Sequence, residues 1–386
     1  EKHYPEEKQA FACAQCHVEG PAGGAMLLAD YTESCGGCHD KGIRTSSGAG
    51  LVMLSLPTID LDVLEEHGQK LPRWPDAANG DFDGELSAAL KLLLADHPAL
   101  TKLLEKFGAA FSFFDLDPDE DDDAQLAADL AREITRLMDD LSSRGQAALI
   151  ERLEQVLGRK IPPEEAASLA AGLPVDLVEQ ANLDWFAGKA REDTPIEKAQ
   201  KHPGGGWFKS DSTLSVRYAP SGHADPLLKS WIDLIVSLDD SKKLIRQSAL
   251  AELATPNSPG QCLTCHSTEQ SAGGKPLVNW RPLDPVTRPR SFTRFAHAPH
   301  TTIKDLADCE SCHRLDKTAN SSASYASQDP AAFVSHFLPI TKADCAQCHT
   351  PHAAGDTCMQ CHNYHVDAAG LLERTPRRKP SALTDR

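Results

Sequence analysis

Twelve cysteines form six pairs, and every pair has the same spacing and the same following residue. Two residues separate the cysteines of each pair, and a histidine directly follows the second cysteine. The six strings read CAQCH, CGGCH, CLTCH, CESCH, CAQCH and CMQCH. No cysteine is left over, so one chemistry has to account for Cys13, Cys16, Cys35, Cys38, Cys262, Cys265, Cys309, Cys312, Cys345, Cys348, Cys358 and Cys361.

The repeated string is the signature of c-type haem attachment, and chance supplies roughly 0.02 copies at this composition. Two thiols three positions apart can form thioethers with both vinyl groups of one porphyrin, and the histidine then lies under the iron as an axial ligand. Zinc sites do not require a histidine after every second cysteine, and disulfide frameworks suit short secreted chains. We therefore expect six haem c groups, with proximal ligands His17, His39, His266, His313, His349 and His362.

The chain resembles multihaem c-type cytochromes through these motifs, strongly over residues 1–40 and 256–366. The resemblance implies that haem is attached outside the cytoplasm, and hence that the protein is periplasmic or extracellular. The sequence opens with Glu1-Lys2-His3 rather than an initiator methionine, so we expect a processed N-terminus from which a signal peptide has been removed.

Six further axial ligands are needed if every iron carries two histidines, and ten histidines remain. His300 and His336 each lie nine positions ahead of a motif, whereas His352 and His365 each follow a proximal histidine by three residues. The string Phe295-Ala-His-Ala-Pro-His300 resembles the F-x-H-x-x-H element of low-potential tetrahaem cytochromes, which implies that its two histidines are distal ligands of different haems. The expected distal ligands are His223, His297, His300, His336, His352 and His365, with His3 and His202 in reserve.

Two other histidines are expected to be structural. His67 ends a predicted helix, where an imidazole suits the helix dipole, and His97 lies at a predicted helix start. Met26 and Met53 are the methionines that could compete as axial ligands. Because a thioether ligand raises the potential, two histidines on each iron predict a low-potential protein.

The formal net charge of −17 restricts the partners. It argues against nucleic acid and against anionic lipid, and it favours redox partner proteins with a basic docking surface. No run of 18 apolar residues is present, so no transmembrane segment is expected.

The predicted fold is mainly α, with irregular haem-wrapped loops, a haem array as core and a haem-free helical insertion. Apolar stripes predict helices within 86–94, 126–141 and 149–157, the last opened by a capping box at Ser143-x-x-Gln146 and ended by Gly158. Pro162-Pro163 starts another helix, a short β-hairpin is expected within 207–223, and two helices occupy 225–238 and 241–254. The expected segments are 1–50 (two haems), 51–200 (acidic, helical), 201–255 (connecting), 256–370 (four haems) and 371–386 (basic tail).

Residues 256–366 show little periodicity and cannot build a core from side chains, so the haems have to supply the apolar mass. A continuous path for electrons further requires the first two haems to lie against the later four.

Two acidic segments leave open the hypothesis that the chain also binds calcium. Residues 115–123 carry seven carboxylates and fit a solvated loop or a helix N-terminus. Asn79-Gly-Asp-Phe-Asp-Gly84 matches the opening of a calcium loop, but its twelfth position is Leu90, where the pattern needs a bidentate carboxylate.

The sequence thus predicts a multihaem cytochrome that carries electrons through six mostly bis-histidine haems, without catalytic residues. One alternative is a multihaem oxidoreductase with one open haem that acts on a small nitrogen or sulfur compound. Nitrite reductases of that kind often carry C-x-x-C-K, which this chain lacks. A second alternative is a subunit of a polymeric extracellular cytochrome filament.

Overall fold

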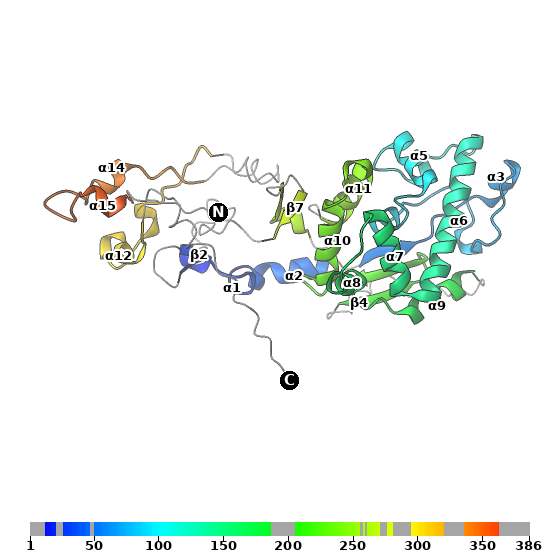
Figure 1. Ribbon diagram of the computed structural model, residues 1–386, viewed down its shortest axis with the longest axis horizontal. Coiled ribbons are helices and arrows are strands. Elements are labelled where there is room, and N and C mark those ends of the chain that lie inside the picture. Colours follow the sequence, from blue (N-terminus) through cyan, green and yellow to red (C-terminus); the bar gives the residue numbers. More distant parts are fainter. Residues whose placement is uncertain are drawn as a thin grey trace. The chain divides into compact units, whose positions relative to one another are not determined.

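The computed structural model describes residues 12–20, 26–46, 50–186, 205–254, 258, 261–270, 276–280, 295–319 and 336–362 (Figure 1). The chain forms two compact units. We call the first, Glu1–Ser34 with Arg281–Ser324 and Ala332–Arg386, the four-motif unit. The second, Cys35–Trp280 with Tyr325–Ala331, is the helical unit. The two N-terminal motifs are divided between them, because the first lies in the four-motif unit and the second in the helical unit.

The helical unit is mainly α, as expected, and α6 is its longest helix (Figure 1). Leu130, Leu137 and Leu141 of α6 are buried along one stripe, which confirms the predicted period. Its helices are α2 (Gly36–Ser46), α3 (Leu61–Glu66), α4 (Ala88–Leu93), α5 (Pro98–Phe107), α6 (Asp121–Arg144), α7 (Gln146–Leu157), α8 (Pro163–Ala170), α9 (Val175–Phe186), α10 (Pro226–Val236) and α11 (Lys243–Leu253).

Local signals account for most of these helix ends. Pro163 begins α8 and Gly158 ends α7 in the left-handed conformation, both as predicted. The predicted capping box is wrong. Ser143 lies in the last turn of α6 and donates to the carbonyl of Asp139, while Gly145 caps α7 with a φ of 53°. A side chain at Gly145 would overlap Val175, so glycine is required there.

One three-stranded antiparallel sheet, in the order β3-β5-β4, completes the helical unit. Strands β4 (Gly206–Ser210) and β5 (Ser215–Ala219) form the expected hairpin. The third strand, β3 (Leu51–Ser55), was not predicted and pairs with β5 from far away in the sequence. The apolar core of the structure, which runs from Leu51 to Val278, lies entirely in this unit.

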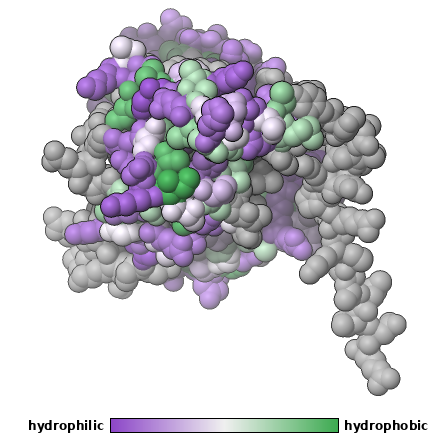
Figure 2. All heavy atoms as spheres, turned by 90° about the vertical axis from the view of Figure 1, so that its left-hand side faces the viewer, coloured by the Kyte–Doolittle hydropathy of each residue, from purple (hydrophilic) through white to green (hydrophobic). Residues whose placement is uncertain are grey.

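The four-motif unit is built differently. Its described elements are β1 (His17–Glu19), β2 (Met26–Leu28) and the short helices α1 (Tyr31–Ser34), α12 (Ala298–Thr301), α14 (Lys342–Cys345) and α15 (Cys358–Cys361). Among its described residues only His336 is buried. Apolar side chains instead lie at the surface among hydrophilic ones (Figure 2), and the large ones are Val18, Leu28, Phe295, Ile303, Leu338, Ile340 and Met359.

The acidic segment is a helix N-terminus, which was one of the two expected forms. Asp123 is buried in the first turn of α6, where it accepts hydrogen bonds from Lys106 Nζ at 2.6 Å and from the amide of Asp117 at 3.0 Å. In the calcium-like string, the Asn79 side chain accepts from the Leu61 amide, and Leu90 is buried in α4. No group of three or more His, Cys, Asp or Glu is placed to hold a metal ion among the described residues.

None of the described helices combines the length and the apolar character needed to cross a bilayer.

Candidate functional site

All six cysteine motifs fold into a tight turn of the same kind. In five of them the histidine amide donates to the carbonyl of the first cysteine, as in His39 to Cys35 at 3.0 Å and His313 to Cys309 at 2.9 Å. In the first motif the Cys16 amide donates to the carbonyl of Cys13 at 3.1 Å. Residues three apart in such a turn lie on the same side, so each motif presents both thiols together.

Three of the expected proximal histidines lie opposite three of the expected distal histidines. The ring centroids of His223 and His266 are 6.3 Å apart, and those of His297 and His313 are 6.4 Å apart. His300 and His349 make the third pair, at 6.1 Å. Each pair joins a different motif to a different expected distal histidine.

These spacings fit a metal ion between the rings. An imidazole nitrogen lies about 2 Å from a bound transition metal and the ring centroid about 1.1 Å behind it, so two imidazoles on opposite faces of one ion have centroids about 6.2 Å apart. Aromatic contacts in proteins span about 4.5–7 Å, a far wider interval than the three pairs occupy. The three pairs therefore have the separation that bis-histidine ligation of iron needs.

Backbone carbonyls orient three of the paired rings. Nδ1 of His266 lies 3.1 Å from the Asn279 oxygen, Nδ1 of His349 lies 3.1 Å from the Gly355 oxygen, and Nδ1 of His300 lies 2.8 Å from the Ala296 oxygen. A carbonyl only accepts, so Nδ1 carries the proton and Nε2 keeps its lone pair for a metal. Metal-ligating histidines in proteins are usually held in this way.

His67 has a different environment. Its Nδ1 lies 2.5 Å from Asp121 Oδ1 and its Nε2 lies 2.9 Å from the Pro118 oxygen, so both nitrogens donate to oxygen. The hydrogen bond to Asp121 is the main cause that raises the pKa of His67. His67 directly follows α3, which confirms the predicted helix end, and its hydrogen bonds join that end to the start of α6.

The loop that carries His223 is anchored by a buried carboxylate. Asp225 accepts hydrogen bonds from the Ser221 amide at 2.8 Å, from Tyr218 Oη at 3.0 Å and from the Leu228 amide at 3.1 Å. It is 3% exposed and forms the N-cap of α10. Burial lowers the pKa of His223 and of His266, which favours the neutral imidazole that a metal requires.

His266 is framed by a β-hairpin and an indole. Strands β6 (Ser267–Gln270) and β7 (Pro276–Asn279) follow the third motif directly and return the chain to Trp280. The indole ring lies 5.1 Å from the His266 ring at an angle of 63°. Burial raises the pKa of the Cys262 thiol in the same motif to about 11.

One aromatic side chain contacts two expected distal ligands at once. The Phe295 ring lies 4.9 Å from the ring of His297 and 4.7 Å from that of His300. His297 faces His313 of the fourth motif, and His300 faces His349 of the fifth.

Neighbouring thiols connect the motifs within the four-motif unit. Burial and the adjacent Cys13 thiol raise the pKa of Cys309, which links the first motif to the fourth. Burial and the nearby Cys361 and Cys312 raise the pKa of Cys345, which links the fifth motif to the sixth and fourth.

In the helical unit, the second motif lies beside the loop that carries His223, the histidine that faces the third motif. A Cβ at Gly222 would lie 3.3 Å from Asp40 Oδ1 and 3.3 Å from Arg44 Nε on α2, and Asp40 directly follows His39. The second motif therefore lies next to the loop that carries His223, and within the four-motif unit the first motif lies next to the fourth.

The other expected ligands differ in burial. His336 is buried at 3% exposure, whereas His352 is exposed. His365, His3 and His202 lie outside the described residues, as does the basic tail.

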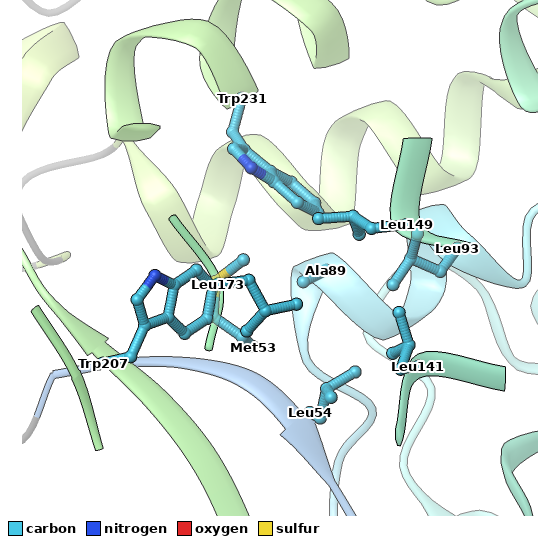
Figure 3. A pocket seen from close by; sticks show the side chains of 9 residues that line it. All are labelled: Met53, Leu54, Ala89, Leu93, Leu141, Leu149, Leu173, Trp207 and Trp231. Atoms are coloured by element: carbon cyan, nitrogen blue, oxygen red, sulfur yellow. The ribbon is translucent and has the colours of Figure 1, made fainter. Parts of the chain in front are cut away.

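The two methionines that could compete as axial ligands lie in different environments. Met53 is buried in the core and lines a cavity of about 10 Å³ together with Leu93, Trp207 and Trp231 (Figure 3). Met26 lies half-buried in β2.

Sequence reasoning missed the β1–β2 and β6–β7 hairpins and the contacts of Trp280 and Asp225. A signal for the hairpins was present, because Ala-Gly-Gly occurs at 22–24 after the first motif and at 272–274 after the third. In both cases an apolar pair follows, which becomes β2 or β7. No comparable signal marks Trp280.

Comparison with protein-family models, curated proteins and solved structures finds no match to this chain.

Proposed function

We propose that the chain is a multihaem c-type cytochrome that carries electrons through six covalently bound haems. The observation that carries the proposal is the pairing of His266, His313 and His349 with three histidines expected as distal ligands, at centroid distances of 6.1–6.4 Å. Each bound haem supplies one-electron redox chemistry, and the protein supplies the thiols and imidazoles that hold it.

The burial pattern supports the same proposal. Ordering a backbone costs about 1–2 kcal/mol per residue, and apolar burial returns about 25 cal/mol for each Å². Among the described residues of the four-motif unit only His336 is buried, while Phe295, Ile303 and Met359 are exposed. Side-chain burial alone does not stabilise such a unit, and four porphyrins attached to its four motifs would provide the missing apolar surface.

Axial ligation favours electron transfer over catalysis. An iron with imidazole on both faces has no position left for a substrate, and axial identity is what separates electron transfer from activation of small molecules. The contact of Asp40 and Arg44 with the His223 loop, and that of Cys13 with Cys309, support neighbouring haems within each unit. With haem attached outside the cytoplasm, we propose a periplasmic or extracellular carrier that docks on basic partners.

Haem stoichiometry tests this proposal directly. Protein matured in a host with cytochrome c assembly is expected to have an intact mass six haems above the polypeptide and the matching pyridine haemochrome absorbance. A variant with Cys309→Ala and Cys312→Ala should carry five. A colourless product, or pigment removed by denaturant, would refute covalent attachment. Six haems with a strong high-spin signal would favour the oxidoreductase with an open haem.

A further inference from the structure

Helix α10 of the helical unit contacts the residues on both sides of the third histidine pair. Its first turn is joined to the loop that carries His223, and its second turn is joined to the segment that orients His266. These are separate contacts, made through Asp225 at the N-cap and through Asp233 in the helix.

The distal contact fixes the His223 loop. Asp225 receives four hydrogen bonds, from the amide and the hydroxyl of Ser221, from the Tyr218 hydroxyl and from the Leu228 amide of α10. Because these donors flank His223 on both sides in the sequence, the backbone of the loop is tied to the start of the helix.

The proximal contact runs through Trp280. The indole Nε1 donates to Asp233 Oδ1 at 2.6 Å, and Lys229 Nζ lies 5.1 Å from the indole centroid while it pairs with Asp233 at 2.8 Å. The same indole packs edge-on against the His266 ring, and the residue before it accepts the hydrogen bond from His266 Nδ1. Trp280 and the residue before it therefore connect α10 to the His266 ring.

We propose that α10 sets the axial geometry of the third haem, with Trp280 and Asp225 as positioning residues, so that the haem-free part of the chain determines the properties of that haem. The inference rests on the proposed function. Its physical basis is that ligands held by a rigid element keep one geometry, and that groups behind a ligand tune the metal. One helix here holds the supports of both imidazoles.

The test is Trp280→Phe in the fully matured protein. The change keeps an aromatic ring and removes the N–H that binds Asp233. We expect an intact mass that still shows six haems, with the low-spin EPR signal and the midpoint potential of one haem shifted and those of the other five unchanged. Trp74→Phe is the matched control, because the Trp74 indole also donates one hydrogen bond, to the Ala78 oxygen at 3.0 Å, within the same unit.

A second variant keeps the test decisive if Trp280→Phe matures incompletely. Asp233→Asn retains an oxygen acceptor for the indole and loses the charge, so we expect a smaller shift at the same haem. The inference is overturned if a variant with six haems leaves every haem signal unchanged, if several haems shift equally, or if Trp74→Phe gives the same shift. Because haem count is measured separately, each of these results leaves covalent attachment intact.

Discussion

The imidazole rings of His297 and His313 lie 6.4 Å apart, with their planes only 14° from parallel. His300 follows His297 by three residues, and its ring lies 6.1 Å from that of His349. One short segment thus faces two motifs that are far apart in sequence. If iron lies between the members of each pair, Phe295 and helix α12 connect two haems through their distal ligands.

Removal of either distal histidine should open one haem and no other. We expect His297→Ala to convert one of six haems to a high-spin form that binds carbon monoxide, and His300→Ala to do the same to a different haem. The double variant should show two. EPR and carbon monoxide difference spectra measure the number.

The control for these variants is His67→Ala, because both nitrogens of His67 are already engaged with oxygen atoms. It should leave the haem spectra unaltered. Retention of six low-spin haems in His297→Ala would contradict the pairing with His313.

A side chain at Gly222 should disturb the contact between α2 and the loop that carries His223. Gly222 has a φ of 139°, and a Cβ there would press on Asp40 and Arg44. Gly222→Ala should cost about 1–3 kcal/mol of unfolding free energy and, if His223 ligates a haem as proposed, alter the EPR signal of that haem. Denaturant unfolding and EPR give the two readouts.

Gly158→Ala provides the comparison for this strain. Gly158 has a φ of 62° with nothing within 4 Å of an added Cβ. We expect a cost of about 1–2 kcal/mol with all haem signals retained. An equal effect of both variants on the haems would argue against a specific role of the Gly222 contact.

Protonation of His67 should stabilise the helical unit. Its pKa is raised above the unfolded value of 6.5, chiefly by the hydrogen bond to Asp121. The stabilisation is therefore complete below pH 6.5 and is lost as the pH rises through the higher folded pKa. The measurement is the difference in unfolding free energy between the native chain and His67→Gln. This difference should fall as the pH rises above 6.5, and a difference that grows with pH would contradict the His67–Asp121 contact.

The packing of α6 should dominate the stability of the helical unit. Leu137 is 0% exposed in its buried stripe, whereas Leu183 on α9 is 58% exposed. Leu137→Ala should lower the free energy of unfolding by about 2–5 kcal/mol, and Leu183→Ala by no more than about 0.5 kcal/mol. Far-UV circular dichroism during denaturation measures both, and equal effects would mean that α6 does not pack as described.

Local features of the fold could be predicted from the sequence because neighbouring residues determine them. The start of α8 at Pro163, the end of α7 at Gly158 and the β4–β5 hairpin follow from proline, glycine and alternation. Strand β3 could not be predicted in the same way, because its partner β5 lies more than a hundred residues away. The capping box at Ser143 failed because Gly145 ends one helix and begins the next.

The same distinction between local and long-range features holds for the candidate site. The motifs are readable because thioether attachment would require two cysteines at this spacing followed by a histidine. The resemblance supplied His297, and His300 also lies nine positions ahead of a motif. The pairing of His223 with His266 and the support from Trp280 depend on how α10 packs, which no local pattern encodes.

The central claim is that imidazoles occupy both axial positions of the haem irons. EPR of the fully oxidised, natively matured protein tests this claim most directly. The account predicts low-spin ferric signals that integrate to the haem count, with no carbon monoxide binding on reduction without denaturant. High-spin signals from the haems of the third, fourth and fifth motifs would contradict it.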